Sequence, residues 1–312
     1  MKPEPDAVAL APVTSPVAPA GFVARHAFPI LLLGLAFAAF SPIFVRLSEV
    51  GPLATAVNRM VLPLPLFFAL LWLRPADRIP TTTQTGRHDV WFVLMSGLFF
   101  AGDLACWNSS VMMTSVANAS VLANITPLFV VGASWVLFKE KPGRLFIVGM
   151  AIALFGSAIM MRDSLALAGR GVAGDFMAMG ASAFYAGYVI TLSKVRKRVS
   201  IVAVMALSCA ASAAVLWPLA AAVETQIWPQ TLNGWLAAAG MVVLVHFGGQ
   251  MLIAMSLAHV SAGLVATMFL AQPIIPALVA WMLFGERVTL IQFAGAAALL
   301  AGLEISRRGT VK

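Results

Sequence analysis

Charge is the scarcest property of this 312-residue chain, since Asp, Glu, Lys and Arg together make up only 10% of it. In a soluble domain such residues make up about 25%, and they cover the surface. Here 61% of the residues are apolar and the mean hydropathy is +0.94. The chain therefore has too little polar surface for a soluble globule, and its composition predicts an integral membrane protein.

Cysteine is almost missing as well. The two that occur, Cys106 and Cys209, each lie in an apolar stretch, and we expect two buried thiols rather than a disulfide. The chain also lacks the patterns H-E-x-x-H, C-x-x-C and G-x-S-x-G and any phosphate-binding loop. These absences predict a protein without a metal or cofactor and without enzymatic activity.

Acidic residues are scarcer than basic ones, 12 against 20, so the net charge is +8. The basic residues lie in short loops beside apolar stretches, where they orient a membrane protein rather than bind nucleic acid. Residues 1–24 lack the basic start and continuous apolar core of a signal peptide, and we expect a disordered cytoplasmic tail there.

Apolar stretches of about 20 residues are long enough to cross a bilayer as helices. Read in this way, the sequence predicts an all-α membrane protein with ten spans. They are 27–48, 52–73, 90–109, 114–138, 143–161, 171–193, 200–223, 233–255, 261–284 and 288–305.

The positions of the basic residues predict the orientation of these spans. With the N-terminus in the cytoplasm, only Arg162, Arg170 and Arg287 fall in outer loops, and the other loop and tail cations face inward. This asymmetry follows the positive-inside rule. We therefore expect a multi-pass protein of a bacterial inner membrane with both termini cytoplasmic.

An internal repeat divides the chain into halves. The stretch 115–162 matches 261–308 without a gap, so that Pro127 recurs as Pro273, Gly149 as Gly295 and Gly156 as Gly302. Five spans in each half would place the two copies upside down relative to each other, as in many secondary transporters. We expect five-helix repeats at 25–161 and 171–308, with the fifth and tenth spans as outer supports or as the contact of a homodimer.

Several motifs resemble the EamA-type branch of the drug/metabolite transporter superfamily. They are S-V-A-N-A-S-V-L-A-N-I-T-P-L-F at 115–129, W-V-L-F-K-E-K at 135–141, W-M-L-F-G-E-R at 281–287, N-R-M-V-L at 58–62 and G-D-F-M-A-M-G at 174–180. The resemblance covers nearly the whole chain. It implies ten spans and the movement of small organic molecules by alternating access, usually outward.

Polar and aromatic residues inside the spans are the candidate substrate-binding residues, because such groups are costly in a bilayer unless paired or facing a wet cavity. They are Asn58, Arg59, Asp103, Trp107, Asn118, Asn124, Tyr185, Tyr188, His246, Gln250 and Gln272. We expect the cavity between the first four spans of each half, with Asn124 and Gln272 meeting at the midplane.

Two of these candidates are charged and lie at similar depths. Arg59 and Asp103 either form a static ion pair or hold the opposite charges of a zwitterionic substrate. Trp107 is one helical turn from Asp103, where it either helps to bind an ammonium group or belongs to the interfacial aromatic belt. Outside the candidate set, Arg46 is expected to meet Glu49 at the outer interface.

The remaining candidates also have two interpretations. Tyr185 and Tyr188, with Phe184, would form an aromatic wall, and the amides either bind substrate or tie helices together. His246 either makes a local hydrogen bond or carries protons.

The favoured substrates are amino acids, including aromatic and other apolar ones. The alternatives are nucleosides or nucleobases and cationic drugs. An intramembrane enzyme and a non-transporting receptor are the rivals from other classes.

Overall fold

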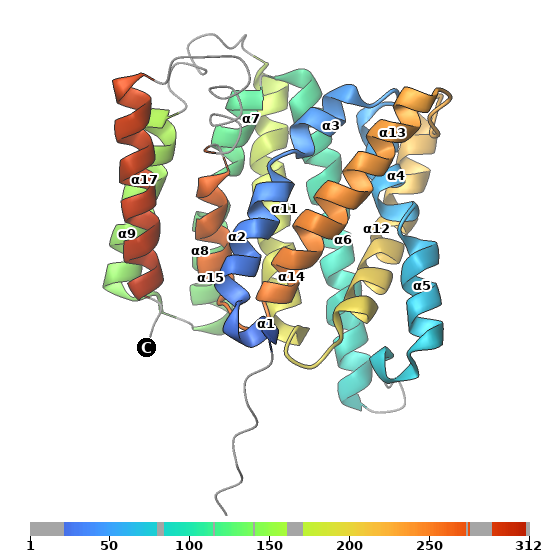
Figure 1. The fold of residues 1–312 in the computed structure, drawn as a ribbon, viewed down its shortest axis with the longest axis horizontal. Coiled ribbons are helices and arrows are strands. Elements are labelled where there is room, and N and C mark those ends of the chain that lie inside the picture. The colour runs from blue at the N-terminus through green and yellow to red at the C-terminus, as the bar shows by residue number, and fades with distance from the viewer. Residues whose placement is uncertain are drawn as a thin grey trace, which may run out of the picture.

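The computed structural model describes residues 22–79, 84–114, 116–139, 141–160, 171–272, 274 and 289–309. Every regular element in these ranges is a helix, and no strand occurs in them. Figure 1 shows the helices side by side with their axes running mostly in one direction, as in a membrane bundle. The all-helical prediction is confirmed for the described residues.

Six stretches of the described chain are long and apolar enough to cross a membrane: Ala27–Leu47, Pro52–Leu73, Gly86–Met113, Val172–Val195, Ile201–Val223 and Leu232–Ser256. Their bounds agree with six predicted spans to within four residues at each end. Shorter apolar helices occupy Thr126–Phe138, Arg144–Ile159 and Ala262–Ala271, where the fourth, fifth and ninth spans were expected. The chain is therefore a multi-pass membrane protein.

The first half begins with a short turn of helix, α1 (Phe22–Arg25), and continues with helices that are interrupted at proline. The elements are α2 (Ala27–Ala38), α3 (Ser41–Leu47), α4 (Pro52–Val61), α5 (Leu64–Leu73), a short η1 (Pro75–Asp77), α6 (Gln84–Met113), α7 (Val116–Ala123), α8 (Thr126–Phe138) and α9 (Arg144–Met160). A proline sits in the first turn of α3, α5 and α8, where its missing N–H leaves no bond unmade. Each of these prolines therefore starts a new helix inside a span.

The second half contains α11 (Val172–Val195), α12 (Ile201–Val223), α13 (Leu232–Gly240), the π-helix η2 (Met241–Met251) and α14 (Leu252–Ser256). It continues with α15 (Ala262–Met268), a short η3 (Phe269–Ala271) and α17 (Leu290–Gly309). The last part of the predicted ninth span lies outside the described residues. The tenth span was predicted to end at 305, but α17 continues to Gly309.

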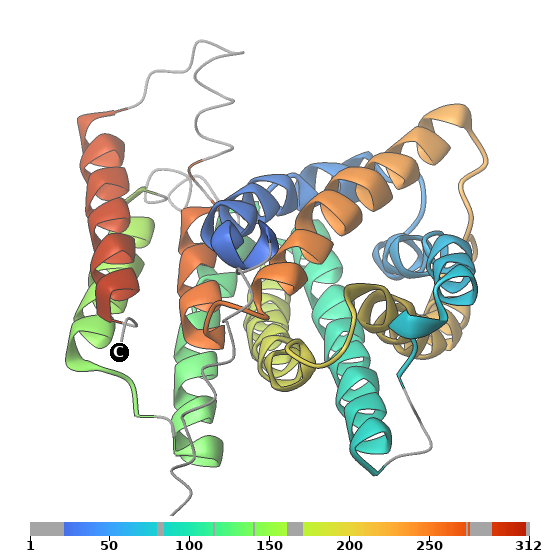
Figure 2. The ribbon, with the colours of Figure 1, turned by 60° about the horizontal axis from the view of Figure 1, so that its bottom comes forward.

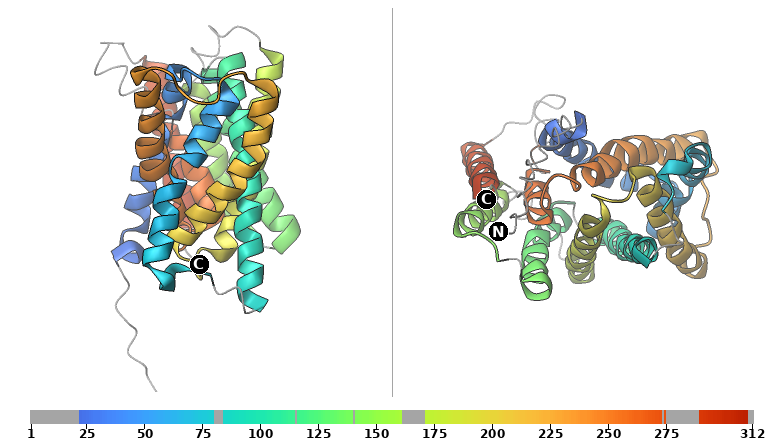
Figure 3. Two further views of the ribbon diagram at one scale, coloured as in Figure 1. Left: turned by 90° about the vertical axis from the view of Figure 1, so that its right-hand side faces the viewer. Right: turned by 90° about the horizontal axis from the view of Figure 1, so that it is seen from below.

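Helices α9 and α17 pack on each other at one edge of the molecule, beside the main bundle (Figures 1, 2 and 3). They are antiparallel, because a side chain at Gly149 would meet Gly302 and Ser306, whereas one at Gly156 would meet Gly295 and Leu299. The two backbones therefore approach closely along a seam of small residues. The expected outer position of the fifth and tenth spans is confirmed.

Two carboxylates connect the halves at one end of the bundle, which the predicted orientation makes the outer end. Glu224, which follows α12, accepts hydrogen bonds from the backbone N–H groups of Leu53 and Ala54 at the start of α4, both at 2.8 Å. Glu49, between α3 and α4, accepts from the N–H groups of Gln230 (3.1 Å) and Thr231 (3.0 Å) just before α13. We call this reciprocal arrangement of Glu49 and Glu224 the carboxylate clasp.

The clasp corrects one prediction. Glu49 does not pair with Arg46, because its Oε2 atom also accepts from the Thr231 hydroxyl at 2.9 Å, and Arg46 is exposed. The free N–H groups and the positive end of a helix attract a carboxylate strongly. The bond from the Thr231 backbone is the largest cause that lowers the pKa of Glu49 below its ordinary value of 4.5.

Candidate functional site

A cavity lies in the interior of the bundle, where broken helices of both halves meet. The volume of this cavity is ≈ 90 Å³. One water needs about 10–15 Å³ of such space, so several waters or a small polar solute would fit. Its lining comes from the α2–α3 junction, α4, α6, the α7–α8 junction, α11, η2 and the turn after η3, and none of it comes from α9, α12 or α17.

Opposite charges face this cavity from two helices of the first half. Arg59 of α4 and Asp103 of α6 both line it, and only 5% and 9% of their surfaces are exposed. They form no ion pair with each other or with another described residue. The predicted static pair is therefore absent, and the Arg59 Nε–H has no hydrogen-bond partner in the described structure.

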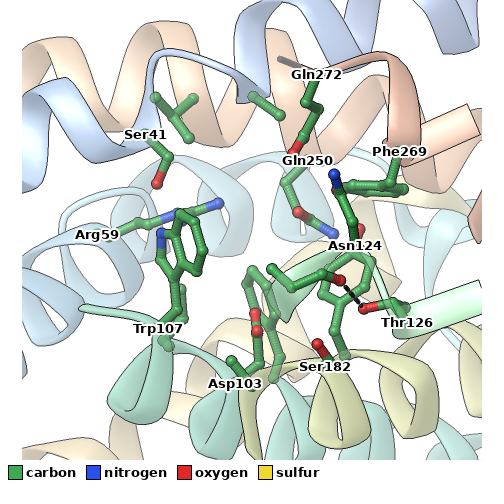
Figure 4. Close-up of a pocket in the computed structure, with 17 residues that line it drawn as sticks. Ser41, Arg59, Asp103, Trp107, Asn124, Thr126, Ser182, Gln250, Phe269 and Gln272 are labelled. Atoms are coloured by element: carbon green, nitrogen blue, oxygen red, sulfur yellow. Dashed lines mark hydrogen bonds between the residues drawn. The ribbon is translucent and has the colours of Figure 1, made fainter. Parts of the chain in front are cut away.

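Trp107 lines the same cavity as Arg59 and Asp103 (Figure 4). It follows Asp103 by one turn of α6, so both project from one helical face. Phe100 shares that face and places its ring 5.4 Å from the Arg59 guanidinium carbon. The structure thus places Asp103 and Trp107 on the same cavity, and their joint binding of an ammonium group stays a prediction.

An aromatic wall of the cavity comes from α11 and η3, next to Phe100 of α6. The rings of Tyr185 and Phe269 meet edge to face at 4.8 Å, and Tyr185 lies 5.5 Å from Tyr188. Tyr188 stacks on Phe100 at 4.7 Å and supports the wall from behind, because it does not line the cavity.

The expected third member of the wall, Phe184, points elsewhere. It is 40% exposed and covers Gly102 on the outside of α6, where a larger residue at position 102 would collide with its ring. Phe100 and Phe269 take its place.

Amide side chains reach the cavity from three helix interruptions. Asn124 follows α7, Gln250 lies in η2 and Gln272 follows η3, and all three line the cavity (Figure 4). The expected meeting of Asn124 and Gln272 around one space is confirmed. Asn124 also has a structural role, since its Nδ2 donates to Ser157 Oγ of α9 at 2.7 Å.

Besides Tyr188, two further predicted site residues do not line the cavity. Asn58 donates to the carbonyl groups of Ala54 (2.9 Å) and Ile227 (2.8 Å), so it ties α4 to the loop before α13. His246 is buried against Phe67, with its Nε2 atom 3.2 Å from Cys209 Sγ. His246 therefore makes a local contact outside the cavity, and proton transfer by this residue stays a prediction.

The two cysteines are free, as predicted, but only Cys209 is buried, whereas Cys106 is half-buried. For Asn118, which lies in α7, the side chain is outside the described part of the structure.

Small hydroxyl residues of the lining were missed in the sequence. Ser41 begins α3, Thr126 begins α8, and Ser182 faces the α7–α8 break from α11. Ser182 Oγ donates to the Leu122 carbonyl at 2.8 Å, and Thr126 Oγ1 donates to the Ala123 carbonyl at 2.8 Å. The Ser-Pro and Thr-Pro pairs at these helix starts were the available signal.

Several buried polar atoms of the lining lack a protein partner. They are Ser41 Oγ, Arg59 Nε, Tyr185 Oη and Gln250 Nε2. A buried polar atom without a partner costs about 1–3 kcal/mol, so such atoms gathered around one cavity indicate bound water or a polar ligand. The site therefore offers opposite charges, unused hydrogen-bonding groups and an aromatic wall.

Comparison with known proteins agrees with this architecture. One chain from a crystal structure has a TM-score of 0.72 at 18% identity, over 91% of this chain and 97% of the other, which supports the fold alone. The uncharacterized transporter YwfM of Bacillus subtilis (strain 168) is 26% identical over 211 residues, 64% of this chain and 69% of the relative.

The profile of the EamA-like transporter family matches residues 27–162 and again residues 172–307. The two matches have equal length and together cover the helices of both halves. They begin and end close to the boundaries of the predicted repeats. The chain belongs to the EamA-like transporter family.

Proposed function

We propose that this transporter exports small amphipathic metabolites by alternating access, with apolar and aromatic amino acids as its main substrates. The observation that carries the proposal is the presence of Arg59 and Asp103 in one cavity without an ion pair between them. Buried charges are retained where they bind a partner, and a zwitterion supplies a partner for each.

In the proposed complex the substrate carboxylate binds the Arg59 guanidinium, which matches it in shape and charge. The substrate ammonium group binds Asp103, and the adjacent Trp107 ring adds a cation–π contact. The apolar side chain then lies against Tyr185 and Phe269, whose rings meet at 4.8 Å. Arg59 is the one cationic side chain among the described residues of the lining, which disfavours solutes with several negative charges.

Ten spans in two inverted repeats of five are part of the proposal. The α9–α17 seam supports it, because Gly149 faces Gly302 while Gly156 faces Gly295. Gly149 and Gly295 are repeat equivalents, as are Gly156 and Gly302, so exchanging the two halves leaves the set of contacts unchanged. A two-fold axis in the membrane plane has this property. We place both termini in the cytoplasm of a bacterial inner membrane, from the distribution of basic loop residues.

The test is counterflow in proteoliposomes loaded with unlabelled leucine or phenylalanine, with the labelled amino acid outside. Parallel reactions use glutamate, a nucleoside and a cationic dye, each with and without a pH gradient. We expect accumulation of labelled leucine and phenylalanine, with much less glutamate. Movement of the nucleoside or dye without any amino acid would replace the proposed substrate class, and no movement of any solute would contradict transport by the purified chain.

A further inference from the structure

A second hollow, with a volume of ≈ 660 Å³, lies at the opposite end of the molecule from the carboxylate clasp. Figure 1 shows α1, α14 and the connection between α11 and α12 together at this end. The hollow is lined by residues of these segments, and its charged or titratable residues are Arg196, Lys197 and His259. Among the described residues its lining contains no acidic side chain, and it shares no residue with the central cavity.

Arg196 is the buried cation of this hollow. Only 8% of its surface is exposed. Its Nε–H donates to the Ala254 carbonyl at 2.8 Å, and its Nη1 donates to the Val199 carbonyl. These bonds fix the guanidinium but leave its charge uncompensated, because Arg196 forms no ion pair with a described carboxylate. Desolvation without a counter-charge lowers the pKa of Arg196 below its ordinary value.

The neighbouring Arg198 provides the contrast. Its guanidinium pairs with Asp89 of α6 at 2.5 Å, so its charge is balanced within the protein. The hydrogen bond to Asp89 raises the pKa of Arg198. Arg198 thus has an ion-pair partner within the protein, whereas the buried Arg196 has none among the described residues and lines the hollow.

The rest of the lining also suits an anion. Lys197 is exposed, and His259 approaches from the turn after α14. Ser200 and Ile201 bring the N-terminus of α12 to the wall, where the helix dipole favours negative charge. Apolar residues, among them Val23 and Met255, complete the lining, as needed beside a glycerol backbone or acyl chain.

We infer that this hollow binds a phosphate group through Arg196, Lys197 and His259, with the headgroup of an anionic phospholipid as its source. Arginine matches a phosphate with two parallel N–H donors, and basic pockets between helices at the membrane surface bind anionic headgroups. Binding would supply the counter-charge that Arg196 lacks and would connect the start of α12 to α14.

The experiment measures thermal unfolding of the purified full chain in detergent, titrated separately with phosphatidylglycerol, phosphatidylcholine and inorganic phosphate. Native mass spectrometry counts the bound lipids. We expect phosphatidylglycerol, but not phosphatidylcholine, to raise Tm and to remain bound. Lys197→Gln and His259→Gln should each weaken this binding, Lys197→Gln by about fivefold, the usual effect of one basic residue at an anionic surface.

Lys141→Gln is the matched control, since Lys141 is an exposed lysine of a loop that lies outside the hollow. Arg196→Gln tests the buried charge, and its unfolding curve without lipid separates a folding defect from a binding defect. If millimolar inorganic phosphate stabilises the native chain but not Lys197→Gln, the hollow is still a phosphate-binding site. Its ligand would then be a free anion rather than a lipid headgroup. Equal responses to both lipids and none to phosphate, or an equal loss in Lys141→Gln, would overturn the inference.

Discussion

Single residues decide what the central cavity can hold. Arg59 and Asp103 are buried there together, yet each lacks an ion-pair partner in the described structure. A residue in this situation is poised to bind, because the cost of its desolvation has already been met by folding. The charge on each side of the cavity can therefore be tested separately.

Replacing Arg59 with Gln should lower leucine counterflow by about 10–100-fold, because a hydrogen bond to a charged group contributes about 1.5–3 kcal/mol. Arg59→Lys should retain part of the activity, since it keeps the charge but loses the two-pronged donor geometry. The rate is measured in proteoliposomes with equal amounts of folded protein. If Arg59→Asp combined with Asp103→Arg transports as well as the native chain, a static brace would explain the two residues better than substrate binding.

The aromatic wall should determine selectivity. Phe269→Ala removes the ring that meets Tyr185 at 4.8 Å, and such a contact is worth about 0.5–1.5 kcal/mol. Transport of phenylalanine should fall roughly 2–10-fold relative to transport of alanine. Phe184→Ala is the control, because Phe184 lies outside the cavity and is 40% exposed. Competition between the two substrates gives the ratio, and an equal change in both variants would argue against the wall.

Helical spacing explains which site residues the sequence could reveal. Asp103 and Trp107 are one turn apart, and the same rule includes Phe100, which was overlooked because phenylalanine is common in apolar spans. The rule fails for Phe184, because the rotation of α11 is set by its close contact with α6 at Gly102. That contact depends on tertiary packing, which periodicity within one helix does not contain.

At the scale of elements, the clasp shows how loops position helices across the two halves. Glu224 accepts two N–H groups of α4, and a capping interaction of this kind contributes about 1 kcal/mol. Small residues make room for it, since a side chain at Gly51 would overlap the Glu224 carboxylate and one at Gly234 would overlap Glu49. The clasp could not be predicted from sequence, because its partners are about 170–180 positions apart.

Acid should weaken the Glu49 side of the clasp. The lowered pKa of Glu49 means that its carboxylate stabilises the fold fully above its ordinary value of 4.5, and that this contribution is lost as pH falls further, through the folded-state pKa. Glu49→Gln should therefore lower Tm at pH 7, and the difference from the native chain should shrink below pH 4.5. Asp77→Asn, which removes an acidic side chain outside the clasp, is the control for the loss of one negative charge. A difference in Tm that stays constant with pH would refute the assignment.

The seam between α9 and α17 makes a second prediction for elements. Gly302→Leu places a side chain against the backbone of Ala153 and Gly149, and overpacking of this kind costs about 1–3 kcal/mol. Gly132→Leu is the matched control on α8, where a Cβ atom has no neighbour within 4 Å. Unfolding in detergent should show a lower Tm for Gly302→Leu only. Equal stability of the two variants would mean that the helices separate without cost.

At the scale of the whole molecule, the orientation in the membrane is the next property to test. A chain without Cys106 and Cys209 would carry either Gln230→Cys, near α13, or Arg74→Cys, after α5. Both positions are exposed. In intact cells an impermeant maleimide should label Gln230→Cys alone, and Arg74→Cys only after the membrane is opened. The reverse pattern would invert the proposed orientation.

The sequence predicted the apolar helices of the described chain well because apolar length is a local property. The six long spans agree closely with prediction, and the outer position of the fifth and tenth spans followed from the repeat. The sequence did not predict the local backbone conformation within each span. An example is the π-helix Met241–Met251, which carries Gln250. A π-helix is a weak backbone arrangement maintained by its surroundings, so neighbouring helices determine it more than local propensity does.

The carboxylate clasp also bears on how the chain is made. Ribosomes complete the first half early, so α4 enters the membrane long before Glu224 has been translated. Until then the first N–H groups of α4 have no acceptor from the second half. Glu49 likewise has no donor from the loop before α13. The ends of the two halves that carry the clasp must therefore become ordered together late in synthesis, and the first half alone is an assembly intermediate.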